Sequence, residues 1–567
     1  MISENSSHSC AGLCRSRPHR HGRLIGACLL AALALAVPGT AANAQDDSEA
    51  PWSVLLITVD CLRPDHMSLY GYERDTTPRL AAFAEEAMVF SNAFSTAPWT
   101  SPGIASLVTG YHPPVHGQAG RFSFYDKEMA SALRVFAAAG YDVLGKNIHG
   151  PSLQDLGFQR PIDGNPAKGL APLENFVEAR GSDPDPFFAW IHIKEPHLPF
   201  APSEKNANRW IDTSRSSPGV DAVRDYWVIF RPEVDVPYRH PGKVEFTEAD
   251  IPVIRALYDG DVADVDERLG RLFDKMKENG LLERTIVVVS ADHGEELFEH
   301  GWVGHASTSY DGKLYDELIR IPLLIRLPDA SKTGRFDALA QGTDLMPTLF
   351  DILEMDAEQL DPAMQGHSLM PVVEGASEEV RDYIFAETTI KGWTTPKDEM
   401  QRRVVAVRSR SHKLMRIPDG DGYRIEGYDL REDPGEQADI YASRRAEFAE
   451  LERALEDWHE ENRRVSSALV LGATQRQIDK LSEALQASDL LSAVRAWESV
   501  EVMEQTWAIA ADPFFEHAPY DAQWAEARRT ANRLLASALD CAARGGRLMP
   551  EASGGSADTS SDWVCEE

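Results

Sequence analysis

The chain has 567 residues, 43% of them hydrophobic, and a formal net charge of −33 at pH 7. That length is enough for roughly two or three folding units with a large apolar core. The acidity argues against a nucleic-acid-binding protein, because phosphate backbones are bound by Lys and Arg in excess. If the substrate is an anion, a metal ion and a few basic side chains must supply positive charge locally.

Residues 1–44 have the pattern of an export signal. Basic residues between Arg15 and Arg23 precede an apolar run at 24–37, and Ala42-Asn43-Ala44 offers a cleavage site before Gln45. We expect cleavage after Ala44 and a mature protein that is periplasmic or secreted, with no stable membrane insertion. The alternative is an uncleaved anchor, because the apolar run overlaps short signal anchors in length.

Three cysteines remain after that cleavage: Cys61, Cys541 and Cys565. In an oxidising compartment the last two could pair, since both lie in the C-terminal tail. The other interpretation is that all three are unpaired thiols. The sequence leaves both open.

The first predicted strand of the mature chain covers residues 52–59 and ends at Asp60. Its continuous apolar run is typical of a strand buried in a parallel sheet. A helix is then predicted over 77–90, with Pro78 in its first turn.

A second helix is predicted to begin just after Thr100, because Pro98, Pro102 and Gly103 impose an ordered turn. A hydroxyl at that place meets free backbone N–H groups and the positive end of the helix dipole. Thr100 is therefore either an N-cap or a nucleophilic oxygen.

Residues 254–279 predict an amphipathic helix, whose acidic residues are interpreted as its solvated face: Asp259, Asp261, Asp264, Asp266 and Glu267. The apolar run 285–289 follows and predicts a second buried strand, which ends near Asp292-His293. Ligands of open α/β sheets bind outside the carboxyl ends of strands, so this pair is well placed to hold a metal ion.

The C-terminal half predicts a helix over 343–353 and a small antiparallel sheet from residues 403–415 and 424–430. Residues 444–547 have helical periodicity and predict two or three helices. The Ser/Gly-rich stretch 551–561 is expected to be disordered.

Eight motifs together resemble the sulfatase family of the alkaline-phosphatase superfamily, in the family's order from about Trp52 to Glu436. They are LLITVDCLRPDHMSLYGY, TSPGIASLVTG, PFFAWIHIKEPHLPF, VADVDERLGRLFDKMKENGLLERTIVVVSADHGEELFEHG, YDELIRIPLLIR, TDLMPTLFDIL, GHSLMPVV and GYDLREDPGE. The resemblance implies an α/β fold, with a mixed sheet sandwiched by helices and a small C-terminal α+β subdomain. The predicted parts are a signal peptide (1–44), a catalytic domain (45–350), a C-terminal subdomain (351–440), a helical extension (441–547) and a flexible tail (548–567).

The chain departs from the family at the position of its best-known chemistry. Sulfatases oxidise the first residue of a C/S-x-P-x-R motif to formylglycine, but here that residue is Thr100 and the Arg position is Ile104. Thr cannot become that aldehyde, so no formylglycine is expected. Superfamily relatives with Thr at this position attack phosphorus with the hydroxyl, which implies that Thr100 is a direct nucleophile.

Matching the family residue by residue implies one divalent metal ion, bound by Asp60, Thr100, Asp292 and His293. Many sulfatases have a second Asp where this chain has Cys61, so a shell of four ligands is predicted. An imidazole among oxygen ligands favours Zn²⁺ or Mn²⁺ over Ca²⁺ or Mg²⁺.

The same matching implies that His197, His305, Lys146 and Lys313 face the substrate. His149 is a weaker match to a family histidine. Outside the motif positions, His192 lies inside the apolar run 187–193 and is predicted to be a packed residue.

The predicted function is an exported, metal-dependent hydrolase of small anionic esters, with phosphate preferred to sulfate because the aldehyde is absent. One alternative is a transferase that moves a phospho-headgroup to an envelope acceptor. The other is a catalytically silent binding protein whose helical extension carries the function.

Overall fold

The computed structural model describes residues 51–118, 132–146, 157–162, 171–181, 185–226, 244, 246–305, 312–355, 364–392, 395, 399, 402–487, 489, 491–500, 518–544, 547–550 and 563–566. The predicted export signal, His149 and residues 551–561 lie outside this part of the chain. None of the described helices combines the length and the apolar character that a membrane span requires.

A mixed sheet of eight strands forms the core, in the order β10-β2-β9-β6-β1-β5-β3-β4. β1 pairs in parallel with both β5 and β6, whereas β9 runs antiparallel to β6 and β2. The strand bounds are β1 (Ser53–Val59), β2 (Met88–Phe94), β3 (Asp142–Lys146), β4 (Arg160–Pro161), β5 (Phe187–Ile193), β6 (Thr285–Ala291), β9 (Arg320–Arg326) and β10 (Gly334–Gln341). The two predicted apolar strands are thus confirmed as β1 and β6 at the centre of the sheet.

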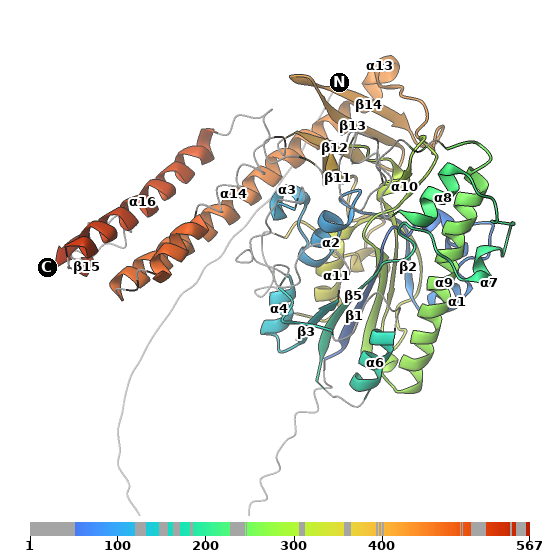
Figure 1. The fold of residues 1–567 in the computed structure, drawn as a ribbon, viewed down its shortest axis with the longest axis horizontal. Coiled ribbons are helices and arrows are strands. Elements are labelled where there is room, and N and C mark those ends of the chain that lie inside the picture. Colours follow the sequence, from blue (N-terminus) through green and yellow to red (C-terminus); the bar gives the residue numbers. More distant parts are fainter. Residues whose placement is uncertain are drawn as a thin grey trace, which may run out of the picture. The chain divides into compact units, whose positions relative to one another are not determined.

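Helices cover both faces of this sheet, as Figure 1 shows. On one side α9 (Ile251–Glu278) contacts α1 (Pro78–Ala84) and α6 (Ala171–Arg180). On the other side α2 (Thr100–Thr109) contacts α4 (Ala132–Ala138) and α11 (Leu345–Ile352). The shorter elements are α3 (Pro113–His116), α7 (Glu204–Ala207), α8 (Pro218–Asp225), α10 (Asp316–Ile319), α12 (Met370–Val373), α13 (Tyr441–Arg444), β7 (Glu296–Leu297) and β8 (Val303–Gly304).

Two predictions from helical periodicity are wrong. The predicted helix 77–90 ends at Ala84, because the apolar residues from Met88 onward enter the sheet as β2. The four aspartates of α9 between Asp259 and Asp266 are buried instead of solvated. They bind neighbouring segments: the Asp266 carboxylate accepts the backbone N–H groups of Arg79 and Leu80 at the start of α1, and the Asp261 carboxylate accepts that of Ala201.

A second, antiparallel sheet follows, in the order β11-β12-β13-β14. Its strands are β11 (Ile384–Thr389), β12 (Arg403–Arg408), β13 (His412–Asp419) and β14 (Gly422–Asp429). α14 (Ala449–Gln486) packs Leu451, Leu455 and Trp458 against Val405 and Leu414 of this sheet. The predicted small C-terminal sheet is therefore present.

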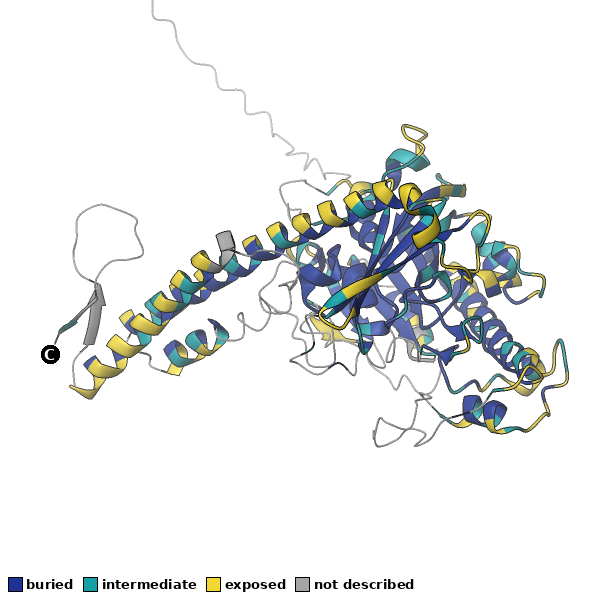
Figure 2. Ribbon diagram, turned by 90° about the horizontal axis from the view of Figure 1, so that it is seen from above, coloured by how far each residue is buried: buried dark blue, intermediate teal, exposed yellow. Residues whose placement is uncertain are grey.

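The helical extension is built from the far part of α14 and from α16 (Ala518–Ala543), which contact each other and lie side by side in Figure 1. Ile478 and Leu481 of α14 share an apolar cluster with Trp524 and Leu534 of α16. The outward side of α14 is exposed along much of its length (Figure 2). Residues 491–500 are also helical.

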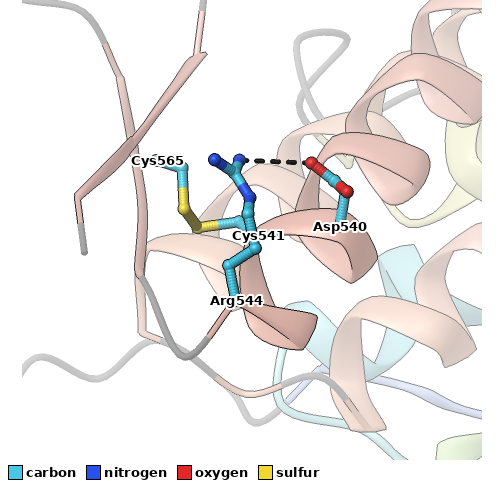
Figure 3. Close-up of a disulfide and its surroundings, with 4 residues drawn as sticks. All are labelled: Asp540, Cys541, Arg544 and Cys565. Atoms are coloured by element: carbon cyan, nitrogen blue, oxygen red, sulfur yellow. Dashed lines mark ion pairs between the residues drawn. A yellow bond between two sulfur atoms is a disulfide. The ribbon is translucent and has the colours of Figure 1, made fainter.

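The predicted flexible tail is structured at both ends. β15 (Arg547–Pro550) pairs antiparallel with β16 (Trp563–Glu566), and a disulfide joins Cys541 of α16 to Cys565 of β16 (Figure 3). Arg544 forms an ion pair with Asp540 beside the disulfide. Of the two interpretations of these cysteines, the structure has the paired one, whereas Cys61 is a buried free thiol.

We expect the Cys541→Ser substitution to loosen the β15–β16 ladder while leaving turnover unchanged. The disulfide closes a loop with a sequence separation of 24 residues, for which loop-closure entropy gives about 3 kcal/mol of stabilisation. Amide hydrogen exchange in β15 and β16 should therefore accelerate by about two orders of magnitude. Ser537→Ala, an exposed change on α16, is the control. Unchanged exchange in the Cys541 variant would contradict the expectation.

Candidate active site

The carboxyl ends of β1 and β6 bring three polar side chains together. Val59 pairs with Ala291 across the two strands, so Asp60 and Asp292 leave the sheet side by side, followed by His293. The Asp60 backbone N–H donates to the carbonyl of Ile193 on the other neighbour, β5, at 2.9 Å. All three side chains are fully buried.

The distances among the potential ligand atoms fit a small divalent ion. Nε2 of His293 lies 3.5 Å from Asp60 Oδ1, 3.4 Å from Asp292 Oδ2 and 3.4 Å from Thr100 Oγ1. Two ligands bound at about 2.1 Å around a tetrahedral centre are about 3.4 Å apart. The predicted ligands therefore converge with suitable spacing, and their oxygen and nitrogen donors suit a divalent cation.

Local hydrogen bonds fix the orientation of two of these ligands. His293 Nδ1–H donates to the Gly294 carbonyl at 2.7 Å, so Nε2 is the nitrogen that presents a lone pair to the cluster. Burial lowers the pKa of His293 to about 4, so the ring is neutral near pH 7, as a metal ligand must be. Asp292 Oδ1 accepts the backbone N–H groups of Cys61 and His293 at 3.2 and 2.9 Å, which turns Oδ2 toward the His293 ring.

Close packing of the first turn of α2 against the end of β6 brings Thr100 to this cluster. A Cβ at Gly103 would lie 2.4 Å from the Asp292 carbonyl oxygen, so only glycine allows the approach. Ser95 Oγ donates to the same carbonyl at 2.5 Å. Thr100 is the first residue of α2, and its hydroxyl therefore lies near the positive end of the helix dipole.

We expect Gly103→Ala to lower kcat/KM about 10²-fold, because a displacement of about 1 Å between reacting groups has that effect. Overpacking at this contact should also cost about 1–3 kcal/mol of unfolding free energy, measurable with urea. The control is Gly472→Ala on α14, where a Cβ meets nothing closer than 3.6 Å. If Gly103→Ala were as active as the control, the close approach would not matter for activity.

Two of the predicted substrate-facing residues, His305 and His197, lie beside the cluster. The ring centroids of His305 are 5.1 Å from His293 and 5.0 Å from His197. His305 Nδ1 contacts Glu295 Oε1 at 3.1 Å. Although burial opposes it, the Glu295 carboxylate raises the pKa of His305 above its usual value.

The two lysines are placed differently. Lys146 is the buried last residue of β3 and pairs with Ile191 of β5, whose partner on β1 is Ile57, three residues before Asp60. The Lys313 ammonium lies 3.0 Å from Glu426 Oε1 on β14 and over the Tyr315 ring. Lys313 thus forms an ion pair with a residue of the small sheet. Its predicted contact with a leaving oxygen stays a prediction.

Cys61 is close to the cluster: its Sγ forms one group of potential ligand atoms with His293 and His305, and another with Asp60 and His197. The shell of four ligands without Cys61 stays a prediction. Cys61 Sγ donates to Asp60 Oδ1 at 3.2 Å, and burial together with Glu295, Asp60 and Asp292 raises the pKa of the thiol well above its usual value. Sγ also lies 3.9 and 4.0 Å from Nδ1 of His293 and His305. Those nitrogens already face the Gly294 carbonyl and the Glu295 carboxylate. Each Nδ1 directs its proton at that oxygen and has no lone pair in the plane of the ring for a metal ion.

Sequence reasoning missed Glu295 and His192. The Glu295 carboxylate contacts His305. Its position two residues after His293, in the acidic run of the motif, is the sequence feature from which a role in the site could have been predicted. His192 is buried as predicted, but its Nε2 lies 3.5 Å from Asp60 Oδ2 and 3.9 Å from Asp292 Oδ2. The sequence feature that could have indicated a role for His192 is that two polar residues, Thr58 and His192, each lie inside an apolar run.

Known proteins provide an independent comparison. A sequence model described as Sulfatase matches residues 53–355, and one described as N-sulphoglucosamine sulphohydrolase, C-terminal, matches residues 299–464. An N-acetylglucosamine-6-O-sulfatase of Bacteroides thetaiotaomicron is 24% identical over 519 residues, covering 77% of this chain and 90% of that protein. An arylsulfatase of Clostridium perfringens is 24% identical over 408 residues, covering 59% and 81%.

The fold also occurs in solved structures. The crystal structure of a phosphonate monoester hydrolase of Agrobacterium radiobacter aligns with a TM-score of 0.57 at 21% identity. The alignment covers 73% of this chain and 96% of that one. The mixed sheet with its flanking helices and small C-terminal sheet is therefore the arrangement of known hydrolase structures.

Proposed function

The chain belongs to the sulfatase family, and we propose that it is an exported, metal-dependent hydrolase that cleaves phosphate or sulfate esters with Thr100 as nucleophile. One observation carries the proposal. Thr100 Oγ1 lies 3.4 Å from His293 Nε2, which itself lies within 3.5 Å of one oxygen of Asp60 and one of Asp292. A hydroxyl among three metal-ligand side chains is placed to be activated for attack.

The residues that would hold the ion are Asp60, Thr100, Asp292 and His293. When bound, a Zn²⁺ or Mn²⁺ ion would stabilise negative charge on the hydroxyl oxygen and on the group under attack. Such activation is needed because a general base alone contributes only about 10²–10⁴-fold.

The side chains around the cluster have separate roles in the proposed reaction. The Thr100 hydroxyl loses its proton to solvent and its Oγ1 attacks phosphorus or sulfur, forming a covalent ester with the transferred group. The bond from phosphorus or sulfur to the leaving oxygen breaks, and the alcohol part of the substrate departs. His305, held by Glu295, gives a proton to the leaving oxygen, and His197 lies beside it on the same side. Lys146 contributes positive charge to the oxygens of the transferred group. Water then hydrolyses the Thr100 ester.

Phosphate esters are the preferred substrates in this proposal. The sulfatase motif places an Arg five residues into its signature to support the aldehyde, and this chain has the fully buried, apolar Ile104 there. A threonine hydroxyl has no aldehyde route for releasing sulfate, whereas it can attack phosphorus directly. Export is supported by the Cys541–Cys565 disulfide, since such bonds persist in oxidising compartments.

The test uses the mature protein, residues 45–567, loaded in turn with Zn²⁺ and Mn²⁺. Aryl phosphate, aryl phosphate diester, aryl phosphonate monoester and aryl sulfate substrates with the same leaving group are compared by kcat/KM. The proposal expects turnover of at least one substrate, with a phosphorus ester ahead of the sulfate. Sulfate ahead of every phosphorus ester would overturn the preference, and no turnover of any would favour a binding protein.

A further inference from the structure

A short chain of buried polar groups runs behind the carboxylates of the site. Thr58 lies on β1, two residues before Asp60, and it pairs in register with His192 on β5. Trp190 lies two residues before His192 and therefore on the same face of β5. All three side chains are buried, and the other residues of the two strands are apolar except for Ser53 at the start of β1.

The hydrogen bonds in this chain determine which nitrogen of His192 carries the proton. Trp190 Nε1–H, which can only donate, donates to Thr58 Oγ1 at 2.9 Å. Thr58 Oγ1 lies 2.9 Å from His192 Nδ1. Among the described contacts of this hydroxyl, Nδ1 is the acceptor that its own proton can reach. Thr58 O–H therefore donates to Nδ1, and the neutral ring has its proton on Nε2.

That Nε2–H faces the two carboxylates of the site. Nε2 lies 3.5 Å from Asp60 Oδ2 and 3.9 Å from Asp292 Oδ2, and the three side chains are fully buried. A ring nitrogen that carries a proton has no lone pair for a metal ion. It faces the carboxylates as a positive edge of the ring beside their oxygens.

We propose that His192 is a positioning residue for the metal site, which orients Asp60 and Asp292 through its Nε2–H, and that Thr58 and Trp190 hold the ring in the tautomer this requires. The inference rests on the proposed function only in assuming that these carboxylates bind a metal ion. Partners outside a metal shell orient its ligands, and their loss typically weakens metal binding 10–100-fold.

The sharpest consequence concerns Thr58, which belongs to neither the ligands nor the catalytic residues. Thr58→Val keeps the shape of the side chain but removes the O–H that Nδ1 accepts. The Nδ1–H tautomer then becomes accessible, and its Nε2 lone pair would face two negative carboxylates. Thr58→Ser keeps the hydroxyl and therefore the tautomer.

The test measures Zn²⁺ affinity by competition with a chromogenic chelator, on the metal-free mature protein and without substrate. We expect Thr58→Val and His192→Leu to weaken Zn²⁺ binding by about 10–100-fold. Thr58→Ser should stay within about threefold of wild type, as should His192→Gln, whose amide N–H can replace Nε2–H. Nitrogen NMR of ¹⁵N-labelled histidines reports the tautomer directly.

Urea unfolding of each metal-free variant separates positioning from structure. A purely structural role would lower the stability of the metal-free protein and leave the Zn²⁺ affinity unchanged, which would overturn the inference. Equal affinities for Thr58→Val and Thr58→Ser would overturn it as well, even if His192→Leu failed to fold. A wild-type protein that binds no Zn²⁺ would overturn both this inference and the proposed function, whereas Zn²⁺ binding that no variant changes would overturn this inference alone.

Discussion

Replacing Thr100 by Ala is expected to lower kcat/KM by four orders of magnitude or more. Loss of a nucleophile has an effect of this size in other hydrolases, because the covalent route disappears. In this chain the loss should be larger than the general-base contribution alone, since Thr100 is both the proposed nucleophile and a predicted ligand. Thr100→Ser keeps a hydroxyl at the start of α2 and should retain much of the activity.

The control for this experiment lies at the other end of the same helix. Thr109 is buried, and its hydroxyl donates to the Ala105 carbonyl at 2.6 Å, away from the cluster. Thr109→Ala removes the same atoms from α2 and should change kcat/KM less than about threefold. Turnover by Thr100→Ala within tenfold of wild type would mean that another group, such as water, attacks the substrate.

A covalent intermediate gives a second readout of the same prediction. Rapid acid quenching of wild-type protein during turnover should trap a mass increase on the peptide that contains Thr100. The increase should be absent from Thr100→Ala and present in Thr109→Ala. An adduct on a different residue would show that this residue, and not Thr100, is the nucleophile. It would not contradict the hydrolase activity.

Much of the site could be predicted because local sequence patterns determine where it lies. The apolar runs that became β1 and β6 could end only near Asp60 and Asp292, and the carboxyl ends of adjacent parallel strands meet at one edge. The helix start at Thr100 was visible from prolines and glycine around it. That Asp60, Thr100, Asp292 and His293 meet at one place was implied by the family resemblance, not by these local patterns.

Features that depend on pairing between distant segments could not be predicted. His192 is an ordinary packed residue until the register sets it opposite Thr58, with its Nε2 beside Asp60. The four aspartates of α9 between Asp259 and Asp266 have the spacing of a solvated face, and only the fold reveals that other segments cover them, as the start of α1 covers Asp266. Lys313 likewise has a partner on β14, more than a hundred residues away.

Removal of the metal ion is expected to abolish turnover and to destabilise the folded protein. Asp60 and Asp292 are fully buried beside His293, and burying carboxylates is costly unless opposite charge compensates them. An ion at a thousand times its Kd adds about 4.1 kcal/mol to the free energy of unfolding. Treatment with a strong chelator should therefore lower the urea midpoint as well as the activity.

The ion that restores activity tests the assignment of His293. An imidazole ligand favours Zn²⁺ or Mn²⁺ over Ca²⁺ or Mg²⁺, so the first two should restore turnover and the last two should restore little. His293→Ala should lose the ion at micromolar metal and lower kcat about 10³-fold, since metal activation is worth several kcal/mol at 1.36 kcal/mol per tenfold in rate. Full restoration by Ca²⁺ would contradict the role of the imidazole.

A surface group provides the control for metal content. In the described part of the chain, His412 lies 3.8 Å from Asp429 and 3.5 Å from Glu447, a second place where three potential ligands meet. Arg444 forms ion pairs with both acids, so their charge is already compensated without a cation. Metal analysis should therefore give one ion per chain for wild type and for His412→Ala, and none for His293→Ala. An ion lost with His412 instead would place the metal outside the cluster around Thr100, and the nucleophile would have to be activated by the protein alone.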